Sequence, residues 1–323
     1  MILVLSHDAY EQGTDPVISW LLHYKADFLK ISMSDFLKAK SRYCIDIDKQ
    51  DIVLNGISFK DKIKTIWHRR FMSELNANLS YDSAHAPNLR AEVRKEIEVF
   101  TEYLSLILKQ KKWLTSFENI NINKLEALNI AQDCGLKTPV SKVLNNKIEA
   151  VRFNEEISEG LIIKTISGSR GHYIHEDDTY VMLTTDMNNE RIDSLPDFFL
   201  PTLFQAKVKA NFEIRVFYLD KQFFPTAILT PKLTKSVDRK MDNGTTSTHF
   251  VPYQLPKELM TKLDNFMDKI GLNTGSIDLM KCSDGSYIFL EVNPVGQYSA
   301  ESERCNFKIE RAIAQWLIKQ DKA

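Results

Sequence analysis

The chain has 323 residues, of which 43% are hydrophobic and 26% charged, which is enough for two or three globular domains. Its 42 basic and 43 acidic residues nearly cancel, and this excludes the basic excess of a nucleic-acid-binding protein. No apolar run approaches the roughly 18 residues of a membrane span, so no membrane partner is expected. The four cysteines form no C-x-x-C pair, and the apolar start reads as a strand rather than a signal peptide, so we expect a reduced, cytoplasmic protein.

The first third of the chain predicts an α/β domain, because strand-like and helix-like segments alternate. The expected elements are a strand at 2–6, an apolar stretch at 15–24, a strand at 28–32, further strands at 43–59 and 62–68, and a helix within 89–114.

A well-marked helix follows. Asn123 is a candidate N-cap with Glu126 three residues later, Gly135 fits the position just after the helix, and Pro139 lies beyond it. The last third is richer in strands and has two helices, near 256–270 and 306–319.

The segment GSIDLMKCSDGSYIFLEVNPVG at 275–296 predicts a hairpin. Asp284 and Gly285 are typical of a two-residue type I′ turn. That turn pairs Ser283 with Ser286, Met280 with Phe289, and Asp278 with Glu291. Because strand side chains alternate, Asn293 would share a face with this acidic pair, whereas the opposite face would carry Ile277, Leu279, Ile288, Leu290 and Val292.

Two directly opposed carboxylates repel each other, and a cation between them removes the repulsion. Oxygen-only ligands suit a hard cation, and magnesium commonly takes one or two protein carboxylates with phosphate and water oxygens. The pattern of Asp278, Glu291 and Asn293 therefore predicts a magnesium site. The alternative is a solvated hairpin with incidental acids.

Two further segments have features of a phosphate site. Lys164 ends an apolar strand before a loop with Gly168, Ser169 and Gly171, where small residues allow backbone N–H groups to approach an anion. A plain hairpin loop is the alternative for this segment.

The other segment is a predicted hairpin at 212–229 that turns near Asp220 and Lys221. Glu213 and Arg215 share one of its faces, where an arginine can donate two parallel bonds to phosphate. A cross-strand salt bridge is the alternative.

Taken in chain order, these positions and a few others resemble the ATP-grasp superfamily. The matching residues are Lys124, Lys164, Gln205, Glu213, Arg215, Arg239, Asp278, Glu291 and Asn293. The resemblance implies an α/β (α+β) fold in which two subdomains sandwich ATP. The implied domains are an N-terminal pre-ATP-grasp domain at 1–115, a central subdomain with lid and glycine loop at 116–200, and a C-terminal subdomain with the metal site at 201–323.

Within the superfamily the chain is most similar to graspetide maturases, the microviridin-type and grasp-with-spasm macrocyclases. The similar segments are ILVLSHD at the start, IWHRRF at 66–71, EIRVFYLD, VDRK, VPYQLP at 251–256 and FLEVNPVGQY at 289–298. Ribosomal-protein glutamate ligases typically end the metal motif EVN-x-x-P-G, whereas here Pro294 follows Asn293 directly.

The resemblance implies a role for each matching residue. ATP phosphates would be contacted by Lys124, Lys164 and the loop of Gly168, Ser169 and Gly171. Adenine would be held by Gln205 and the backbone of Lys207 and Val208, with Glu213 near the nucleotide or substrate. Such linkers usually carry an acid after the glutamine, but here Ala206 and Lys207 follow. Arg215 and Arg239 would be catalytic, and Mg²⁺ would be held by Asp278, Glu291 and Asn293.

The implied function is an ATP-dependent macrocyclase. It would phosphorylate Asp or Glu side chains of a ribosomally made precursor peptide, then join them to Ser or Thr as ω-esters or to Lys as ω-amides. A homodimer is expected from the family. Two alternatives are a ligase that adds free amino acids to a protein or small molecule, and a non-catalytic peptide-binding module that has kept the fold.

A basic run, His68, Arg69 and Arg70, follows a predicted strand in the first domain. It would either help to bind the acidic core of such a peptide or form a basic patch on the surface.

Overall fold

The computed structural model describes the chain except residues 38–40, 72–85, 168–171, 176–177, 182 and 231–247. The chain forms two compact units, one of Met1–Ile120 with Gln297–Ala323 and the other of Asn121–Gly296. The C-terminal segment thus belongs to the first unit, which differs from the expected 201–323 domain. A boundary near 200 within the second unit stays a prediction.

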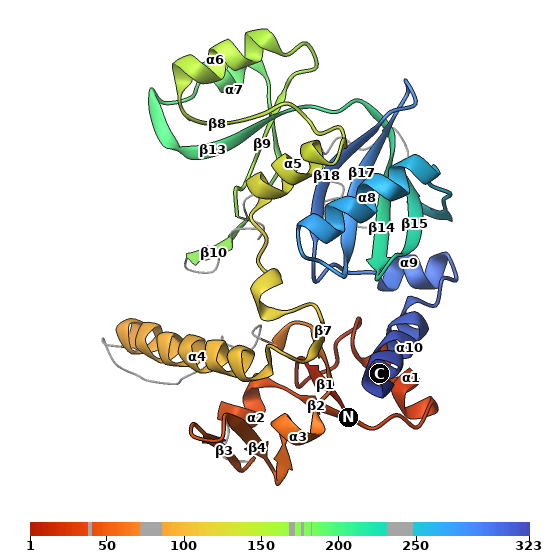
Figure 1. Ribbon diagram of the computed structural model, residues 1–323. Coiled ribbons are helices and arrows are strands. Elements are labelled where there is room, and N and C mark those ends of the chain that lie inside the picture. The colour runs from red at the N-terminus through yellow and green to blue at the C-terminus, as the bar shows by residue number, and fades with distance from the viewer. Residues whose placement is uncertain (38–40, 72–85, 168–171, 176–177, 182, 231–247) are drawn as a thin grey trace. The chain divides into compact units, whose positions relative to one another are not determined.

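A four-stranded parallel sheet in the order β2-β1-β6-β7 forms the centre of the first unit (Figure 1). The inner strands β1 (Ile2–Leu5) and β6 (Thr65–His68) are buried at every position. Continuous burial is typical of parallel strands that are covered on both faces, and it explains the unbroken apolar sequence of β1.

The outer strands of this sheet are β2 (Phe28–Ile31) and β7 (Lys112–Leu114). The other elements of the first unit are α1 (Asp15–His23), α2 (Met33–Leu37), β3 (Tyr43–Asp46), β4 (Asp51–Leu54), β5 (Ile57–Ser58), α3 (Phe59–Lys62), α4 (Ala86–Leu108), a 3₁₀ turn η2 (Phe117–Asn119), α9 (Ser299–Arg304) and α10 (Ile309–Lys322). Helix α10 contacts α1, β1, β6 and β7, which explains why the C-terminal segment belongs here.

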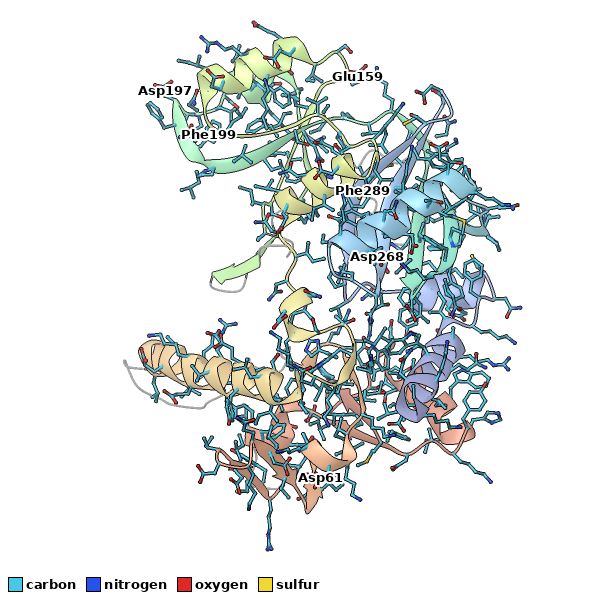
Figure 2. All side chains as sticks on the ribbon, in the orientation of Figure 1. Asp61, Glu159, Asp197, Phe199, Asp268 and Phe289 are labelled. Atoms are coloured by element: carbon cyan, nitrogen blue, oxygen red, sulfur yellow. The ribbon has the colours of Figure 1, made fainter. Side chains whose placement is uncertain are left out.

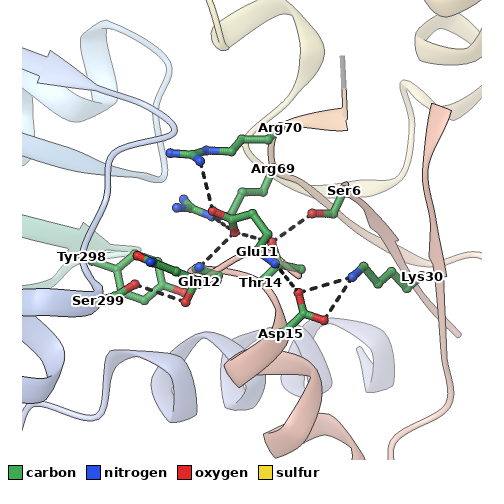
Figure 3. Close-up of polar contacts among 11 residues, drawn as sticks. Ser6, Glu11, Gln12, Thr14, Asp15, Lys30, Arg69, Arg70, Tyr298 and Ser299 are labelled. Carbon is green, nitrogen blue, oxygen red and sulfur yellow. Dashed lines mark hydrogen bonds and ion pairs between the residues drawn. The ribbon is translucent and has the colours of Figure 1, made fainter. Parts of the chain in front are cut away.

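A buried ion pair joins the segment between β1 and α1 to the residue directly after β6 (Figure 3). Glu11 accepts hydrogen bonds from Arg69 Nε at 3.0 Å, Thr14 Oγ1 at 2.8 Å and the Gly13 N–H at 2.9 Å. Burial raises the pKa of Glu11, but Arg69 and Thr14 outweigh it and leave this pKa below its ordinary value. The Tyr298 hydroxyl donates to the Gly13 carbonyl, which ties the C-terminal segment to this cluster.

His68 and Arg69 are 2% and 4% exposed, so both expectations for this basic run are wrong at these two positions. The imidazole of His68 lies against Phe117, with ring centroids 4.5 Å apart, and neither ring nitrogen has a hydrogen-bond partner among the described residues. Arg70 is partly exposed, and its Nη1 lies 3.4 Å from Oε1 of Glu11. The run is basic in sequence, but most of it is part of the interior.

The second unit contains a central sheet in the order β12-β9-β13-β8, covered on one face by α6 and α7. Its elements are β8 (Ser141–Asn146), α6 (Lys147–Glu156), β9 (Leu161–Lys164), β12 (Thr185–Met187), α7 (Asn189–Asp193) and β13 (Phe198–Ala206). Two short paired strands, β10 (His172–His175) and β11 (Asp178–Val181), form a separate ribbon.

The unit also contains a five-stranded antiparallel sheet in the order β16-β15-β14-β17-β18. Its elements are α5 (Lys124–Asp133), β14 (Ala210–Leu219), β15 (Gln222–Leu229), β16 (His249–Pro252), α8 (Lys257–Lys269), β17 (Thr274–Cys282) and β18 (Tyr287–Asn293). One face packs against α5 and α8. Phe289 of β18, labelled in Figure 2, belongs to this core. The centroid of its ring lies 4.8 Å from that of Phe266 of α8. The opposite face carries the polar side chains of Arg215 and Asp278, together with apolar ones such as Phe217 and Ile228.

Among the described residues, none of the helices is both long and apolar enough to cross a membrane. All four cysteines lie in described segments, and none of them forms a disulfide.

We predict that His68→Met flattens the pH dependence of stability. Burial lowers the pKa of His68 from 6.5 to about 3, so the unfolded chain takes up a proton first as the pH falls below 6.5. The free energy of unfolding of the wild type should therefore fall by up to about 1.4 kcal/mol per pH unit below about pH 6.5.

Urea unfolding followed by tryptophan fluorescence measures this, because all four tryptophans lie in the first unit. His249→Met, at an exposed position of β16, is the matched control for loss of a histidine. If the free energy of unfolding changes equally with pH in wild type and His68→Met between about pH 6.5 and pH 5, the prediction is contradicted.

Candidate functional site

The turn between β17 and β18 differs from the expected one. The Cys282 N–H donates to the Ser286 carbonyl at 3.0 Å, and the Gly285 N–H donates to the Cys282 carbonyl at 3.1 Å. Ser283, Asp284 and Gly285 therefore form a three-residue loop, so the two-residue type I′ turn and the Ser283–Ser286 pair are wrong. Gly285 has a φ of +86°, which a glycine adopts without steric cost in this kind of loop.

A β-bulge in β18 restores the register of the acidic pair. Leu279 pairs with Phe289, whereas Asp278 pairs with Glu291, so Leu290 is the extra residue. The three-residue loop shifts the pairing by one residue relative to a two-residue turn. The extra residue in β18 cancels that shift beyond the bulge. The expected pairing of Asp278 with Glu291 is therefore confirmed.

The same bulge changes which residues enter the core. Met280 pairs with Ile288, so its expected pairing with Phe289 is wrong. Phe289 is 1% exposed and belongs to the core, whereas Ile288 and Leu290 are only partly buried and lie outside that cluster. The expectation that Ile288 and Leu290 share the face of Ile277, Leu279 and Val292 is therefore wrong.

Each carboxylate of the pair holds a basic side chain. Arg215 donates from Nε and Nη2 to the two oxygens of Asp278, at 2.8 and 2.9 Å. Lys124 Nζ lies 3.1 Å from an oxygen of Glu291. Arg215 also stands opposite Asp278 in the β14–β17 register, so the cross-strand salt bridge that was the alternative for this segment is present. Three neighbouring strands and one helix thus assemble four charges.

The position of Lys124 follows from the cap of α5. The Asn123 side chain accepts the N–H groups of Leu125 and Glu126 at 2.9 and 3.3 Å, which confirms the predicted N-cap. Lys124 is therefore the first helical residue, and contacts between α5 and β18 bring it to Glu291. The expected helix end is also confirmed, since Gly135 has a φ of +73°.

Asn293 stands opposite Ser276 and is fixed by a tight turn. Its side-chain oxygen accepts the Val295 N–H at 3.1 Å, and its carbonyl accepts the Gly296 N–H at 3.1 Å. A Cβ at Gly296 would overlap the Ser276 side chain, so the turn closes onto β17 only with glycine there. Its place in the alternation puts Asn293 on the face of the acidic pair.

Among the described residues, no three or more His, Cys, Asp or Glu side chains gather as metal ligands. The candidate here consists of two carboxylates and one amide. Oxygen donors of this kind suit magnesium, which fills its remaining positions with water or phosphate oxygens.

Gln205 lies in the interior of the central sheet and is 2% exposed. Its Nε2 donates to Ser141 Oγ at 3.0 Å, but its Oε1 has no partner among the described residues. A buried acceptor without a donor costs about 1–3 kcal/mol, so the position is suited to a ligand N–H group.

Lys207 and Val208 come directly after β13, which ends at Ala206. The Lys207 N–H is already donated to the Gly160 carbonyl at 2.9 Å, and Lys207 Nζ lies 2.6 Å from Asp186. Val208 is partly buried and follows directly. A cavity of about 460 Å³ borders Lys207, Gly160 and Asp186. The backbone N–H of Lys207 is therefore not free for a nucleotide base.

The remaining candidates are only partly described. Lys164 ends β9, where it pairs with Leu203 of β13, and Glu213 lies two residues before Arg215 on the same strand face. Gly168, Ser169, Gly171 and Arg239 lie outside the described residues. Sequence reasoning did not single out Ser141, Asp186 or Ser276, because their partners are distant in sequence and no local motif marks them.

No family model and no curated protein matches the chain, but solved structures do. The fold is that of the ATP-grasp proteins. The macrocyclase MdnC from Microcystis aeruginosa, bound with precursor peptide MdnA, matches with a TM-score of 0.82 at 21% identity, over 98% of this chain and 99% of that one. The Chryseobacterium gregarium RiPP-associated ATP-grasp ligase, in complex with ADP and a leader and core peptide, matches with a TM-score of 0.78 at 21% identity, over 100% of this chain and 97% of that one. The ATP-grasp ligase PsnB, complexed with minimal precursor, Mg and ADP, matches with a TM-score of 0.77 at 18% identity, over 99% of this chain and 96% of that one. The predicted fold class is confirmed.

Gly296→Ala should loosen the hairpin of β17 and β18, since the new methyl group meets Ser276. We expect a loss of about 1–3 kcal/mol, measured as faster amide hydrogen exchange in these two strands. Ser276→Gly removes the overlap, so the double variant should lose less than the sum of the two single variants. Strictly additive losses would show that the two residues are not in conflict.

Proposed function

We propose that this chain is an ATP- and magnesium-dependent macrocyclase of the graspetide type. The observation that carries the proposal is the opposed pair of Asp278 and Glu291, with Arg215 and Lys124 bound to it, in a chain with the ATP-grasp fold. An oxygen-donor pair beside two cations suits a metal and a polyphosphate together. The precursor peptides in the similar solved structures support a peptide substrate.

The residues present fit Mg²⁺. Asp278 and Glu291 would be its carboxylate ligands, and Asn293 would add an amide oxygen. When bound, the ion neutralises charge on the phosphate oxygens during phosphoryl transfer.

The residues present also fit ATP. The buried, unpartnered Oε1 of Gln205 is an acceptor for the amino group of adenine. Lys207 and Val208 would border the base through backbone groups other than the Lys207 N–H. Lys124 and Lys164 would contact the phosphates, together with Gly168, Ser169 and Gly171, and Glu213 would lie near the nucleotide or substrate.

The proposed reaction has two steps. An oxygen of an Asp or Glu side chain of the precursor attacks the γ-phosphorus of ATP, and ADP leaves as the acyl phosphate forms. A Ser or Thr hydroxyl, or a Lys amine, of the same peptide then attacks the acyl carbon, loses its proton and expels phosphate. Arg215 and Arg239 would stabilise the charge on the transferred group, because guanidinium donors match its oxygens.

A homodimer and a cytoplasmic location are further parts of this proposal. The four cysteines, none of which forms a disulfide, are consistent with a reducing compartment.

The test is to combine the protein with ATP, Mg²⁺ and its precursor peptide and to measure the peptide mass. We expect loss of one water per bond formed, with ADP released. Glu291→Gln should lower the rate by on the order of a hundredfold or more, because it removes a metal carboxylate. Glu258→Gln, at an exposed position of α8, is the matched control and should keep the rate.

Other mass changes would identify the alternatives. A heavier product would show addition of free amino acids, whereas absence of both ATP binding and mass change would show a non-catalytic binding module. Full activity of Glu291→Gln would contradict the metal assignment.

Gln205→Leu should weaken ADP binding by about tenfold, because it removes the acceptor proposed for the adenine amino group. Titration calorimetry with ADP and with an analogue lacking the 6-amino group provides the test. The variant and the wild type should bind the analogue equally. A parallel loss for both ligands would instead indicate a disturbed sheet.

A further inference from the structure

The two carboxylates of the proposed metal site are already neutralised within the protein. Asp278 receives two hydrogen bonds from Arg215, and Glu291 holds Lys124 at 3.1 Å. All four side chains are partly buried, with exposed fractions between 16% and 33%. The cluster therefore has two positive and two negative charges in a setting where water screens them incompletely.

Such a cluster has little attraction for a free divalent cation. Both oxygens of Asp278 take part in the fork with Arg215, and charge-assisted bidentate pairs are the strong ones among hydrogen bonds. A metal ion at this position would also lie near two cations. If the ion binds alone, a carboxylate must therefore lose its ion pair with Arg215 or Lys124, and the ion is repelled by these two cations.

A polyphosphate changes this balance. It supplies negative oxygens to which arginine and lysine bind well, so both cations can leave their carboxylates without losing a charged partner. The carboxylates then become available as ligands at the moment when phosphate oxygens are also present to complete the shell of the metal.

We propose that Lys124 and Arg215 act as internal counterions that exclude magnesium from the site until nucleotide binds. Nucleotide binding transfers the two cations from carboxylate to phosphate, and metal affinity rises as a result. Because coupling between two ligands is reciprocal, the metal raises nucleotide affinity by the same factor. This inference rests on the proposed function, since it uses the same site, but it concerns the order in which the site is filled.

The experiment measures binding of Mn²⁺ to the full chain by electron paramagnetic resonance, with and without ADP. Wild type should bind Mn²⁺ weakly alone and tightly with ADP. In Lys124→Met and in Arg215→Met, Mn²⁺ affinity without nucleotide should rise by about tenfold or more, because a positive charge near the ion is gone. The increase that ADP produces should shrink in both variants.

Three further variants make the result specific. Lys124→Arg keeps the charge and should keep weak Mn²⁺ binding without nucleotide. Lys262→Met, at the surface of α8, removes a lysine of another ion pair and should behave as wild type. Lys124→Met/Glu291→Gln should lose the gain, because the carboxylate that binds the ion is missing. Circular dichroism confirms folding of each variant.

The outcomes separate the two proposals. If wild type binds Mn²⁺ with ADP but Lys124→Met and Arg215→Met bind Mn²⁺ alone no better than wild type, the counterion role is overturned and the proposed function stands. If wild type binds no Mn²⁺ even with ADP, both are overturned.

Discussion

Two carboxylates that face each other across adjacent strands repel, and every other feature of the candidate site depends on how this repulsion is removed. In the structure described here the compensation comes from Arg215 on β14 and Lys124 at the start of α5. A divalent ion can supply the same charge. The hairpin of β17 and β18 can therefore satisfy its acidic pair in two ways, and the choice depends on whether phosphate is present for the two cations.

The scaffold places these groups on well-packed elements. Asp278 and Glu291 lie on strands whose other face packs against α5 and α8 through Phe289, Phe266 and their neighbours. Sites on packed strands keep their geometry better than sites on loops. The turn after β18 adds a second restraint, since Asn293 is held by Val295 and Gly296.

The carboxylate pair, the cap of α5 and the Asp220–Lys221 hairpin were predictable because each depends on local chemistry and strand alternation. The loop and the bulge of β18 were not, because a three-residue turn and one extra residue cancel in the register of Asp278 and Glu291. Their effect on packing is seen at Phe289, which is buried in the core, whereas Ile288 and Leu290 on either side of it are only partly buried. The same limit applies to His68 and Arg69: a basic run suggests a surface, and only the distant partners Glu11 and Phe117 reveal that it is buried.

The most direct measurement is a crystal structure with ADP and Mn²⁺, in which anomalous scattering locates the metal. Carboxylate oxygens of Asp278 and Glu291 should both lie about 2.1 Å from the ion, with Arg215 and Lys124 on phosphate oxygens. A metal bound elsewhere, with the fork of Arg215 on Asp278 intact beside bound nucleotide, would contradict the assignment.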